Sequence, residues 1–142
     1  MTAPRKPINR ALEPFGTTIF TEITRLALQH GAVNLGQGFP NFAGPAFLKD
    51  AAIRAILDDR NQYARMPGEP PLVRAAAEKL KRTYGLEYDP VEEVTVYSGC
   101  TEAIHCAFLG LCEPGDEVVL FEPFYDSYRA CAAMAGVTPK PA

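Results

Sequence analysis

The 142-residue sequence lacks the long apolar runs that membrane proteins contain. No stretch approaches the roughly 20 apolar residues that cross a bilayer, and the first segment, MTAPRKPINRALEP, has no continuous apolar core of the secretory kind. Basic runs are missing too, because the 14 basic and 17 acidic residues are scattered along the chain. We therefore expect a soluble, cytoplasmic protein that binds neither membranes nor nucleic acid through a charged patch.

The four cysteines do not form a metal or redox motif. Cys100, Cys106, Cys112 and Cys131 follow one another at spacings of six, six and nineteen residues, which match no CxxC pattern. We interpret them as small buried residues of a protein in a reducing compartment, and we expect no metal site.

The composition is that of a globular protein. The chain is 47% hydrophobic and 22% charged with a net charge of −3, which is too apolar and too weakly charged for disorder. Its length suits about one domain of roughly 100–200 residues. The thirteen prolines cluster with glycine at the boundaries of the predicted elements, as in Pro67–Pro71 and Glu113–Asp116.

Helical and extended patterns alternate along the chain. Helices are predicted over 17–30, 45–59, 70–84, 101–111 and 124–135, the first with Thr17 or Thr18 as its N-cap and Gly31 as its end. Strands are predicted over 94–97, over 117–121 as a buried strand, and from 137 onward, with 32–35 a strand or an extended segment. Strands that alternate with helices predict a parallel, doubly wound α/β sheet with helices on both faces. Because such sheets usually have about five or more strands, we expect this chain to be the N-terminal part of a longer protein.

Two of these helices carry apolar residues at helical spacing. We expect one face of the helix over 45–59 to be buried, and one side of the helix over 70–84 to be apolar. The residues of the first face are Phe47, Leu48, Ala51, Ala52, Ala55 and Ile56, and those of the second are Leu72, Ala75, Ala76 and Leu80.

A candidate anion site lies where the strand over 94–97 turns into a helix. Ser98 and Gly99 lead into the first helical turn, where free backbone N–H groups and the positive end of the helix dipole attract anions, and Ser98 and Thr101 add hydroxyl groups. The pattern is neither GxGxxG nor GxxxxGK[ST], so neither a dinucleotide nor a Walker-type nucleotide is indicated. Many such junctions bind nothing, and spacing alone leaves phosphate binding open.

Two aromatic segments are further candidates. Glu122–Tyr128 begins at the carboxyl end of a predicted strand, where open α/β sheets place their ligands, and Tyr125 could present its ring to a planar cofactor. Alternatively, the rings of this segment pack the following helix against the sheet. The segment Asn61–Arg65 offers a tyrosine hydroxyl and a cation, or is a solvated surface loop.

Five segments, taken in their order and separations, resemble one family. Together they resemble the class I and II aminotransferases of pyridoxal phosphate fold type I, in particular the kynurenine aminotransferase (glutamine transaminase K, cysteine-S-conjugate β-lyase) branch. The resemblance covers the chain from about Ala11 onward. It implies that residues 1–44 form an N-terminal arm, a helix and a small-domain segment, and that residues 45–142 form the first, incomplete part of the cofactor-binding large domain. The segments are Val33–Pro40, Asn61–Tyr63, Ser98–Ala103, Pro114–Val118 and Glu122–Tyr125.

The resemblance implies a binding site for pyridoxal 5′-phosphate. Gly99, Cys100 and Thr101 would donate to the phosphate, and Tyr125 would stack on the pyridine ring. Cys100 stands where the family more usually has a small residue, but it offers the same backbone N–H.

The resemblance also implies substrates and a partner. Gly38 would lie with its N–H beside the substrate carboxylate, and Tyr63 would reach the phosphate bound by the neighbouring subunit of a homodimer. The implied reaction moves an amino group from an amino acid to a 2-oxo acid. The same fold would also serve a cysteine-S-conjugate β-lyase or a succinyldiaminopimelate aminotransferase. An alternative of another class is a naturally truncated, non-catalytic product, either an inert remnant or a binding partner of a full-length subunit.

No catalytic residue is expected within this chain. The family's Schiff-base lysine, the acid that pairs with the pyridinium nitrogen and the arginine that binds the substrate carboxylate would all lie beyond position 142. The lysines present are in a tail, on helix faces or at the terminus, and none occupies a motif suited to a buried amine of lowered pKa. We therefore expect the chain by itself not to catalyse transamination. These lysines are Lys6, Lys49, Lys79, Lys81 and Lys140.

Overall fold

The computed structural model describes residues 9–38 and 40–142, so Lys6 lies outside the described residues. The described residues form two compact units. The first contains the residues up to Gln37 together with Ser98–Ala142, and the second is Gly38–Tyr97. The predicted boundary between residues 44 and 45 concerns a division into small and large domains, and it stays a prediction.

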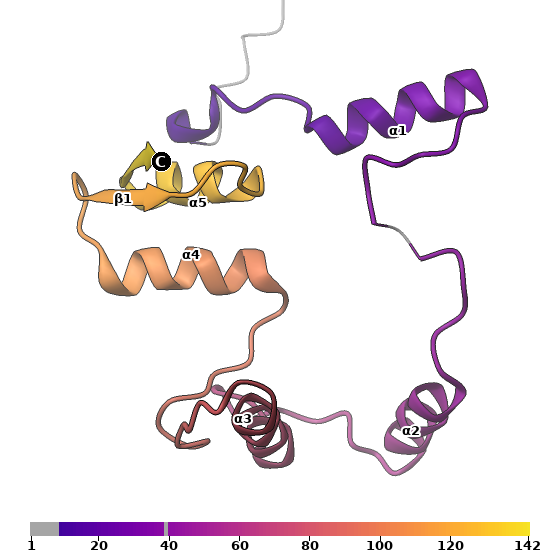
Figure 1. Cartoon of the computed structure of the whole chain (residues 1–142). Helices are drawn as coiled ribbons and strands as arrows, with labels where there is room; N and C mark the ends of the chain where they lie inside the picture. Colours follow the sequence, from indigo (N-terminus) through magenta and orange to yellow (C-terminus); the bar gives the residue numbers. More distant parts are fainter. Residues whose placement is uncertain (1–8, 39) are drawn as a thin grey trace, which may run out of the picture. The chain divides into compact units, whose positions relative to one another are not determined.

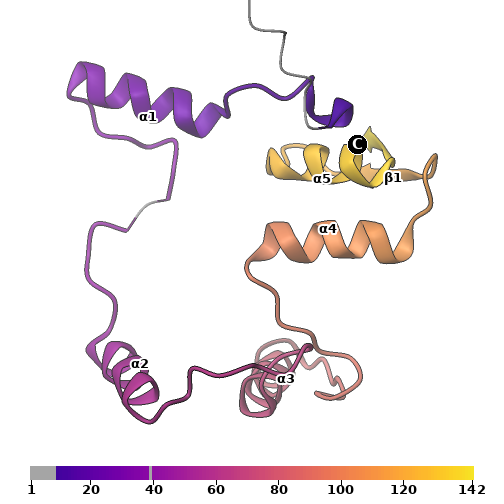
Figure 2. The same cartoon turned by 180° about the vertical axis from the view of Figure 1, so that it is seen from behind.

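The first unit contains a strand–helix–strand arrangement. In Figures 1 and 2, α4 and α5 lie side by side, and α5 connects the two strands. The strands pair in parallel, with Glu117 opposite Thr138 and Leu120 opposite Pro141. This β1–α5–β2 unit confirms the parallel pairing that the sequence predicts. The elements of this unit are η1 (Arg10–Leu12), α1 (Ile19–His30), α4 (Cys100–Leu111), β1 (Glu117–Leu120), α5 (Ser127–Ala135) and β2 (Thr138–Pro141).

The helix α1 has the capping residues that its sequence predicts. The side chain of Thr18 accepts a hydrogen bond from the backbone N–H of Thr21, and Gly31 ends the helix in the left-handed conformation with a φ of 58°. After the helix, the Asn34 amide donates to the Thr24 hydroxyl at 3.1 Å. Residues 32–35 form no strand, so the extended alternative is the correct one.

The core of the first unit lies around α5. Ala132, Ala135 and Val137 are buried, and Phe108, Cys112 and Val118 pack against them. Small alanine side chains allow α4 and β2 to approach α5 closely.

Burial of the cysteines differs from the prediction. All four are free, but only Cys131 is buried, because it lies on the covered face of α5. Cys106 and Cys112 are half-buried, and Cys100 is exposed at the first turn of α4.

Two strand predictions need correction. The segment Val94–Tyr97 forms no strand, because no described segment pairs with it along its length; only the N–H of Val96 bonds, to the Pro67 carbonyl at 2.9 Å. The strand β1 is half-buried rather than buried, and Val119 is 61% exposed. Both differences have the same cause, since a β-branched segment becomes a buried strand only when neighbouring strands and helices cover it.

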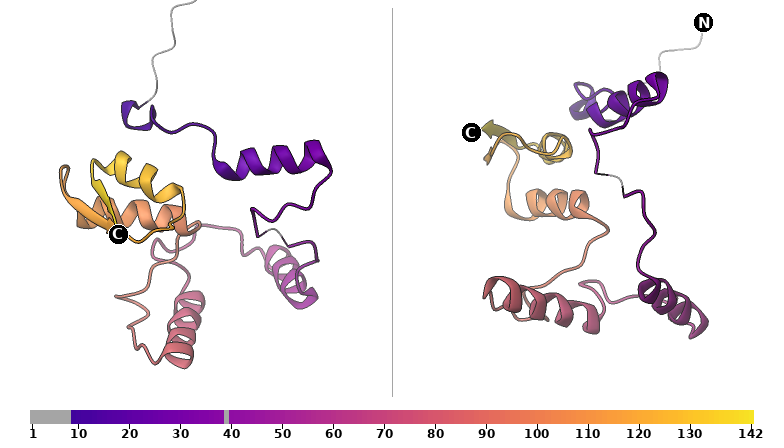
Figure 3. Two further views of the ribbon diagram at one scale, coloured as in Figure 1. Left: turned by 45° about the horizontal axis from the view of Figure 1, so that its top comes forward. Right: turned by 45° about the vertical axis from the view of Figure 1, so that its right-hand side comes forward.

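In the second unit, the covered side of α3 (Pro70–Tyr84) includes part of the predicted apolar side. Val73 and Ala77 are buried, and Ala76 and Leu80 are half-buried, whereas Leu72 and Ala75 are exposed. The chain that returns after α3, visible in Figure 3, brings Val96 beside Gly68 and Val73. This contact covers the Val73 side of α3, which the predicted apolar side only partly overlaps.

The other helix of this unit, α2 (Ala46–Leu57), has an uncovered apolar face. Phe47 is 69% exposed, and Leu48 and Ile56 are also exposed. Ala51 and Ala52 are exposed, while Ala55 is half-buried. The predicted burial is therefore wrong for this chain, because no other described element packs on α2.

Candidate functional site

The first turn of α4 has an open backbone. Gly99 precedes it with a φ of 96° and a ψ of 162°, a conformation essentially restricted to glycine. A Cβ at Gly99 would meet no atom within 4 Å, so the backbone angles rather than the space require glycine here. Within the described residues, no side chain caps this end of α4. The N–H groups of Cys100 and Thr101 are therefore free to donate to an external acceptor.

One carboxylate lies close to this turn. The side chain of Glu102 accepts a hydrogen bond from the backbone N–H of Ser98. This contact turns the carboxylate back toward the residue before the turn and engages the Ser98 N–H. The donors that remain for an anion therefore come from Gly99 onward.

The helix α5 holds Thr101 at two points. The Thr101 hydroxyl donates to the Ser127 hydroxyl at 3.3 Å, and the Thr101 carbonyl accepts from the Cys131 thiol at 3.7 Å. Ser127 and Cys131 are one turn apart on α5, so they contact the side chain and the backbone of the same residue. Burial raises the pKa of the Cys131 thiol, which keeps it protonated and able to donate.

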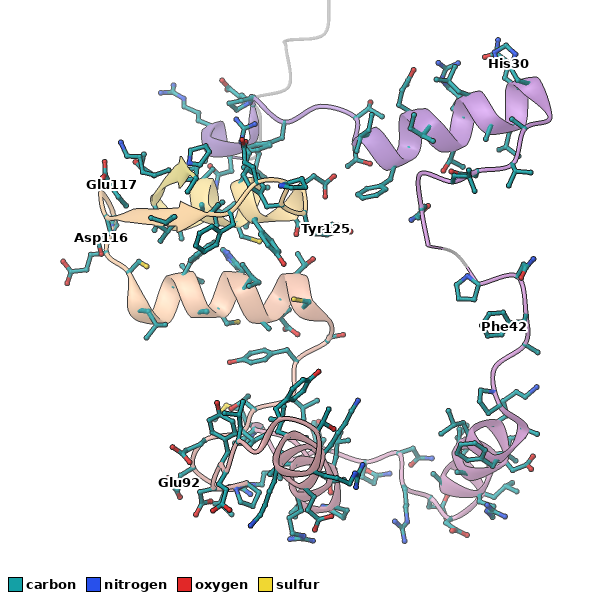
Figure 4. All side chains as sticks on the ribbon, in the orientation of Figure 1. His30, Phe42, Glu92, Asp116, Glu117 and Tyr125 are labelled. Atoms are coloured by element: carbon teal, nitrogen blue, oxygen red, sulfur yellow. The ribbon has the colours of Figure 1, made fainter. Side chains whose placement is uncertain are left out.

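Tyr125 lies in the loop just before α5 and is labelled in Figure 4. Its ring contacts Phe20 at a centroid distance of 5.5 Å and Tyr128 at 6.2 Å, the second pair being edge-to-face. The Tyr125 residue is nevertheless 50% exposed. Packing and stacking are therefore compatible interpretations, since neighbours hold the ring while the residue remains accessible.

A cavity of about 760 Å³ opens beside this ring. It lies within the range of small-molecule pockets, roughly 300–1,000 Å³. Tyr125, Asp126 and Ser127 line it, together with Phe20 and with hydroxyl groups from the start of α1. Tyr125 and Ser127 thus border the same cavity.

Two predicted site residues belong to the second unit. Tyr63 is fully exposed in the loop before α3, and Gly38 is exposed with open space around it. The loop of Tyr63 is closed by Glu69, whose carboxylate accepts from the Arg65 N–H at 3.2 Å. The roles of Tyr63 and Gly38 toward the α4 turn stay predictions, because each unit is described by itself.

Sequence reasoning missed Ser127. Its residue type carries no signal of its own, and the contact with Thr101 joins residues 26 positions apart. The available signal is its position directly after Tyr125 and Asp126 at the start of a helix.

The described part of the chain contains no candidate metal cluster and no candidate membrane span. There, no group of three or more histidine, cysteine or acidic residues could hold a metal ion. No described helix has the length and apolar character that crossing a membrane requires.

This chain is similar to known proteins in both sequence and structure. The family model described as aminotransferase class I and II matches residues 30–142. The probable N-succinyldiaminopimelate aminotransferase DapC of Mycobacterium tuberculosis is 54% identical over 125 residues, covering 88% of this chain and 32% of that protein. The kynurenine–oxoglutarate transaminase of Dictyostelium discoideum is 41% identical over 141 residues, covering 99% of this chain and 32% of that protein.

A solved structure shows the fold. The N-succinyldiaminopimelate aminotransferase from Mycobacterium tuberculosis matches with a TM-score of 0.86 and 51% identity, covering 94% of this chain and 35% of the other. The chain belongs to the class I and II aminotransferase family, and its α/β fold is that of the fold type I enzymes. It spans about a third of the length of the relatives that it matches.

Proposed function

We propose that this chain forms the N-terminal part of a pyridoxal phosphate-dependent aminotransferase that moves an amino group from an amino acid to a 2-oxo acid. Family membership supports the reaction class. The observation that carries the proposal is the uncapped first turn of α4, which Thr101 ties to Ser127, two residues after the half-exposed ring of Tyr125.

The donor set of this turn fits a phosphate monoester. The backbone N–H groups of Gly99, Cys100 and Thr101 would hold the phosphate at the positive end of the α4 dipole. The ring of Tyr125 would fix the tilt of the pyridine and shield one of its faces from water. When bound, the cofactor supplies the electron sink for the reaction. The residues of this chain bind and orient it, while the Schiff-base lysine would come from the rest of the enzyme.

The remaining roles follow from the resemblance. Gly38 would donate its N–H to the substrate carboxylate. Tyr63 would reach the phosphate bound by a second subunit, which would make the active site a property of a homodimer. The full exposure of Tyr63 supports this role, since an exposed ring and hydroxyl are available to a partner.

Two kinds of amino donor are candidates for the complete enzyme. The two relatives described above are named for N-succinyldiaminopimelate and for kynurenine. We propose that the complete enzyme uses a donor of one of these kinds with a 2-oxo acid as the acceptor.

An assay of the complete polypeptide that contains this chain tests the proposal. The protein is loaded with pyridoxal phosphate and incubated with 2-oxoglutarate and each donor, namely kynurenine and N-succinyldiaminopimelate. We expect glutamate to form together with the 2-oxo acid of at least one donor, detected by mass spectrometry. Cofactor binding without amino transfer to or from any of these compounds would contradict the proposed reaction.

A further inference from the structure

The hydroxyl groups of Thr101 and Ser127 can together donate two hydrogen bonds. Each hydroxyl has one proton, and the Thr101 proton is engaged in the bond to Ser127 Oγ at 3.3 Å. Among the described residues, no acceptor takes the Ser127 proton. The pair therefore has one donor left, and that donor is on Ser127.

Ser127 also lies where a ligand can reach it. It is the first residue of α5, whose N-terminus is not capped by the Asp126 side chain. It lines the same cavity as Tyr125, whereas Thr101 is not part of that wall. Ser127 is thus accessible from the cavity that Tyr125 also lines.

The packing of the rest of α5 holds Ser127 in place. Cys131, one turn further along, is buried and contacts the Thr101 carbonyl. Ala132 and Ala135 are buried in the core of the unit. A donor placed on such a helix loses little additional freedom when it binds a ligand.

We infer that Ser127 donates its hydroxyl proton to the phosphate of the cofactor, and that Thr101 orients Ser127 by donating to it. This inference rests on the proposed function, because it needs a phosphate at the first turn of α4. A hydroxyl that accepts one hydrogen bond becomes a stronger donor in the next, so the two hydroxyls act as a unit. Ser127 is then a binding residue and the Thr101 hydroxyl a positioning group, while the Thr101 backbone N–H keeps its own role.

The test compares two ligands that differ only in the phosphate. Pyridoxal phosphate and pyridoxal are titrated into the apo form of the complete polypeptide, and Kd is measured for Ser127→Ala, Thr101→Val and the double variant. Ser127→Thr restores a hydroxyl. Thr138→Val, on the exposed side of β2, is the matched control for the loss of a hydroxyl.

We expect Ser127→Ala to raise the Kd of pyridoxal phosphate roughly tenfold, the factor of a hydrogen bond to a charged group. The Kd of pyridoxal should stay within about twofold, which a merely structural defect would not allow. Thr101→Val should have a smaller effect in the same direction, and the double variant should be no weaker than Ser127→Ala. Ser127→Thr and Thr138→Val should bind like the wild type.

Four results would overturn the inference. Equal losses of affinity for both ligands in Ser127→Ala would show that the Ser127 hydroxyl is structural. No loss of affinity for either ligand would show that this hydroxyl does not contact the cofactor. Additive losses of affinity in the double variant would show that the hydroxyls of Thr101 and Ser127 act independently. If the wild type binds pyridoxal phosphate no better than pyridoxal, the proposed phosphate site fails and the inference fails with it. A wild type that prefers pyridoxal phosphate beside an unaffected Ser127→Ala contradicts the inference alone.

Discussion

The ring of Phe20 lies 5.5 Å from the ring of Tyr125 and is tilted against it by 37°. Phe20 is in the first turn of α1, and Tyr125 precedes α5, so the contact joins the N-terminal helix to the segment that follows β1. It supports the Tyr125 ring while half of that ring stays exposed. A ring held in this way is suited to receive a flat ligand without rearrangement.

For Tyr125, we expect the ring to matter more than the hydroxyl. In the complete enzyme, Tyr125→Phe should weaken cofactor binding by less than about 1 kcal/mol, the scale of one ordinary hydrogen bond. Tyr125→Ala should cost roughly 1–3 kcal/mol, by analogy with base–aromatic stacking. The measurement is the dissociation constant of pyridoxal phosphate, with single-turnover amino transfer in parallel. Equal damage from both variants would assign the role to the hydroxyl, and no effect from either would make Tyr125 a packing residue.

Replacement of Gly99 should reduce stability or cofactor affinity because of the backbone conformation at this position. Gly99→Ala forces an alanine into a φ of 96°, which should destabilise the fold by about 1–3 kcal/mol or shift the α4 turn and weaken phosphate binding. Gly110→Ala is the matched control, because Gly110 is inside α4 and its Cβ would meet no atom within 4 Å. It should stabilise by up to about 1 kcal/mol through helix propensity. Denaturant unfolding and cofactor titration of both variants check this, and a harmless Gly99→Ala would remove the glycine requirement.

The sequence predicts the local features better than the tertiary ones. The limits of α1 follow from Thr18 and Gly31, because capping depends on residues that are neighbours in the chain. The segment Val94–Tyr97 has the pattern of a strand but pairs with no described segment along its length, since strand formation depends on a distant partner. The apolar face of α2 fails for the same reason: its pattern specifies what can be buried, and only a neighbouring element can bury it.

For the candidate site, too, the sequence indicates local features but not tertiary contacts. Gly99 and Thr101 could be identified from their place in a local turn, and Tyr125 from its place after a strand. The Ser127 contact could not, because it depends on how α4 packs against α5. The sequence thus predicts which residues could bind a phosphate, while the packing of the two helices decides which hydroxyls meet.

Expressed alone, the 142-residue chain should associate with itself. Large apolar side chains are exposed on α2 and on β1, including Phe47, Ile56 and Val119, and the two-stranded sheet has free edges. We expect marginal stability, a broad unfolding transition and a midpoint that depends on protein concentration. Sedimentation and thermal unfolding over a range of concentrations measure this. A monomer with one sharp transition, independent of concentration, would contradict the prediction.

The thiols should differ in reactivity and in its pH dependence. Burial raises the pKa of Cys131, so at a given pH less of it is thiolate, and its reaction should begin at a higher pH than for an ordinary thiol. Cys100 is exposed and should react first. Labelling with a thiol reagent from pH 7 to 10, followed by peptide mapping, gives both rates, with Cys100→Ser and Cys131→Ser identifying the peptides. Faster labelling of Cys131 than of Cys100 would show that α5 does not bury this thiol.

The central claim is that the first turn of α4 and the ring of Tyr125 hold pyridoxal phosphate. A crystal structure of the complete polypeptide with the cofactor bound tests it most directly. We predict phosphate oxygens about 2.7–3.2 Å from backbone nitrogens of the Gly99–Thr101 turn. We also predict that the pyridine lies face to face with the Tyr125 ring. A phosphate bound away from this turn, or a pyridine that does not contact Tyr125, would contradict the account.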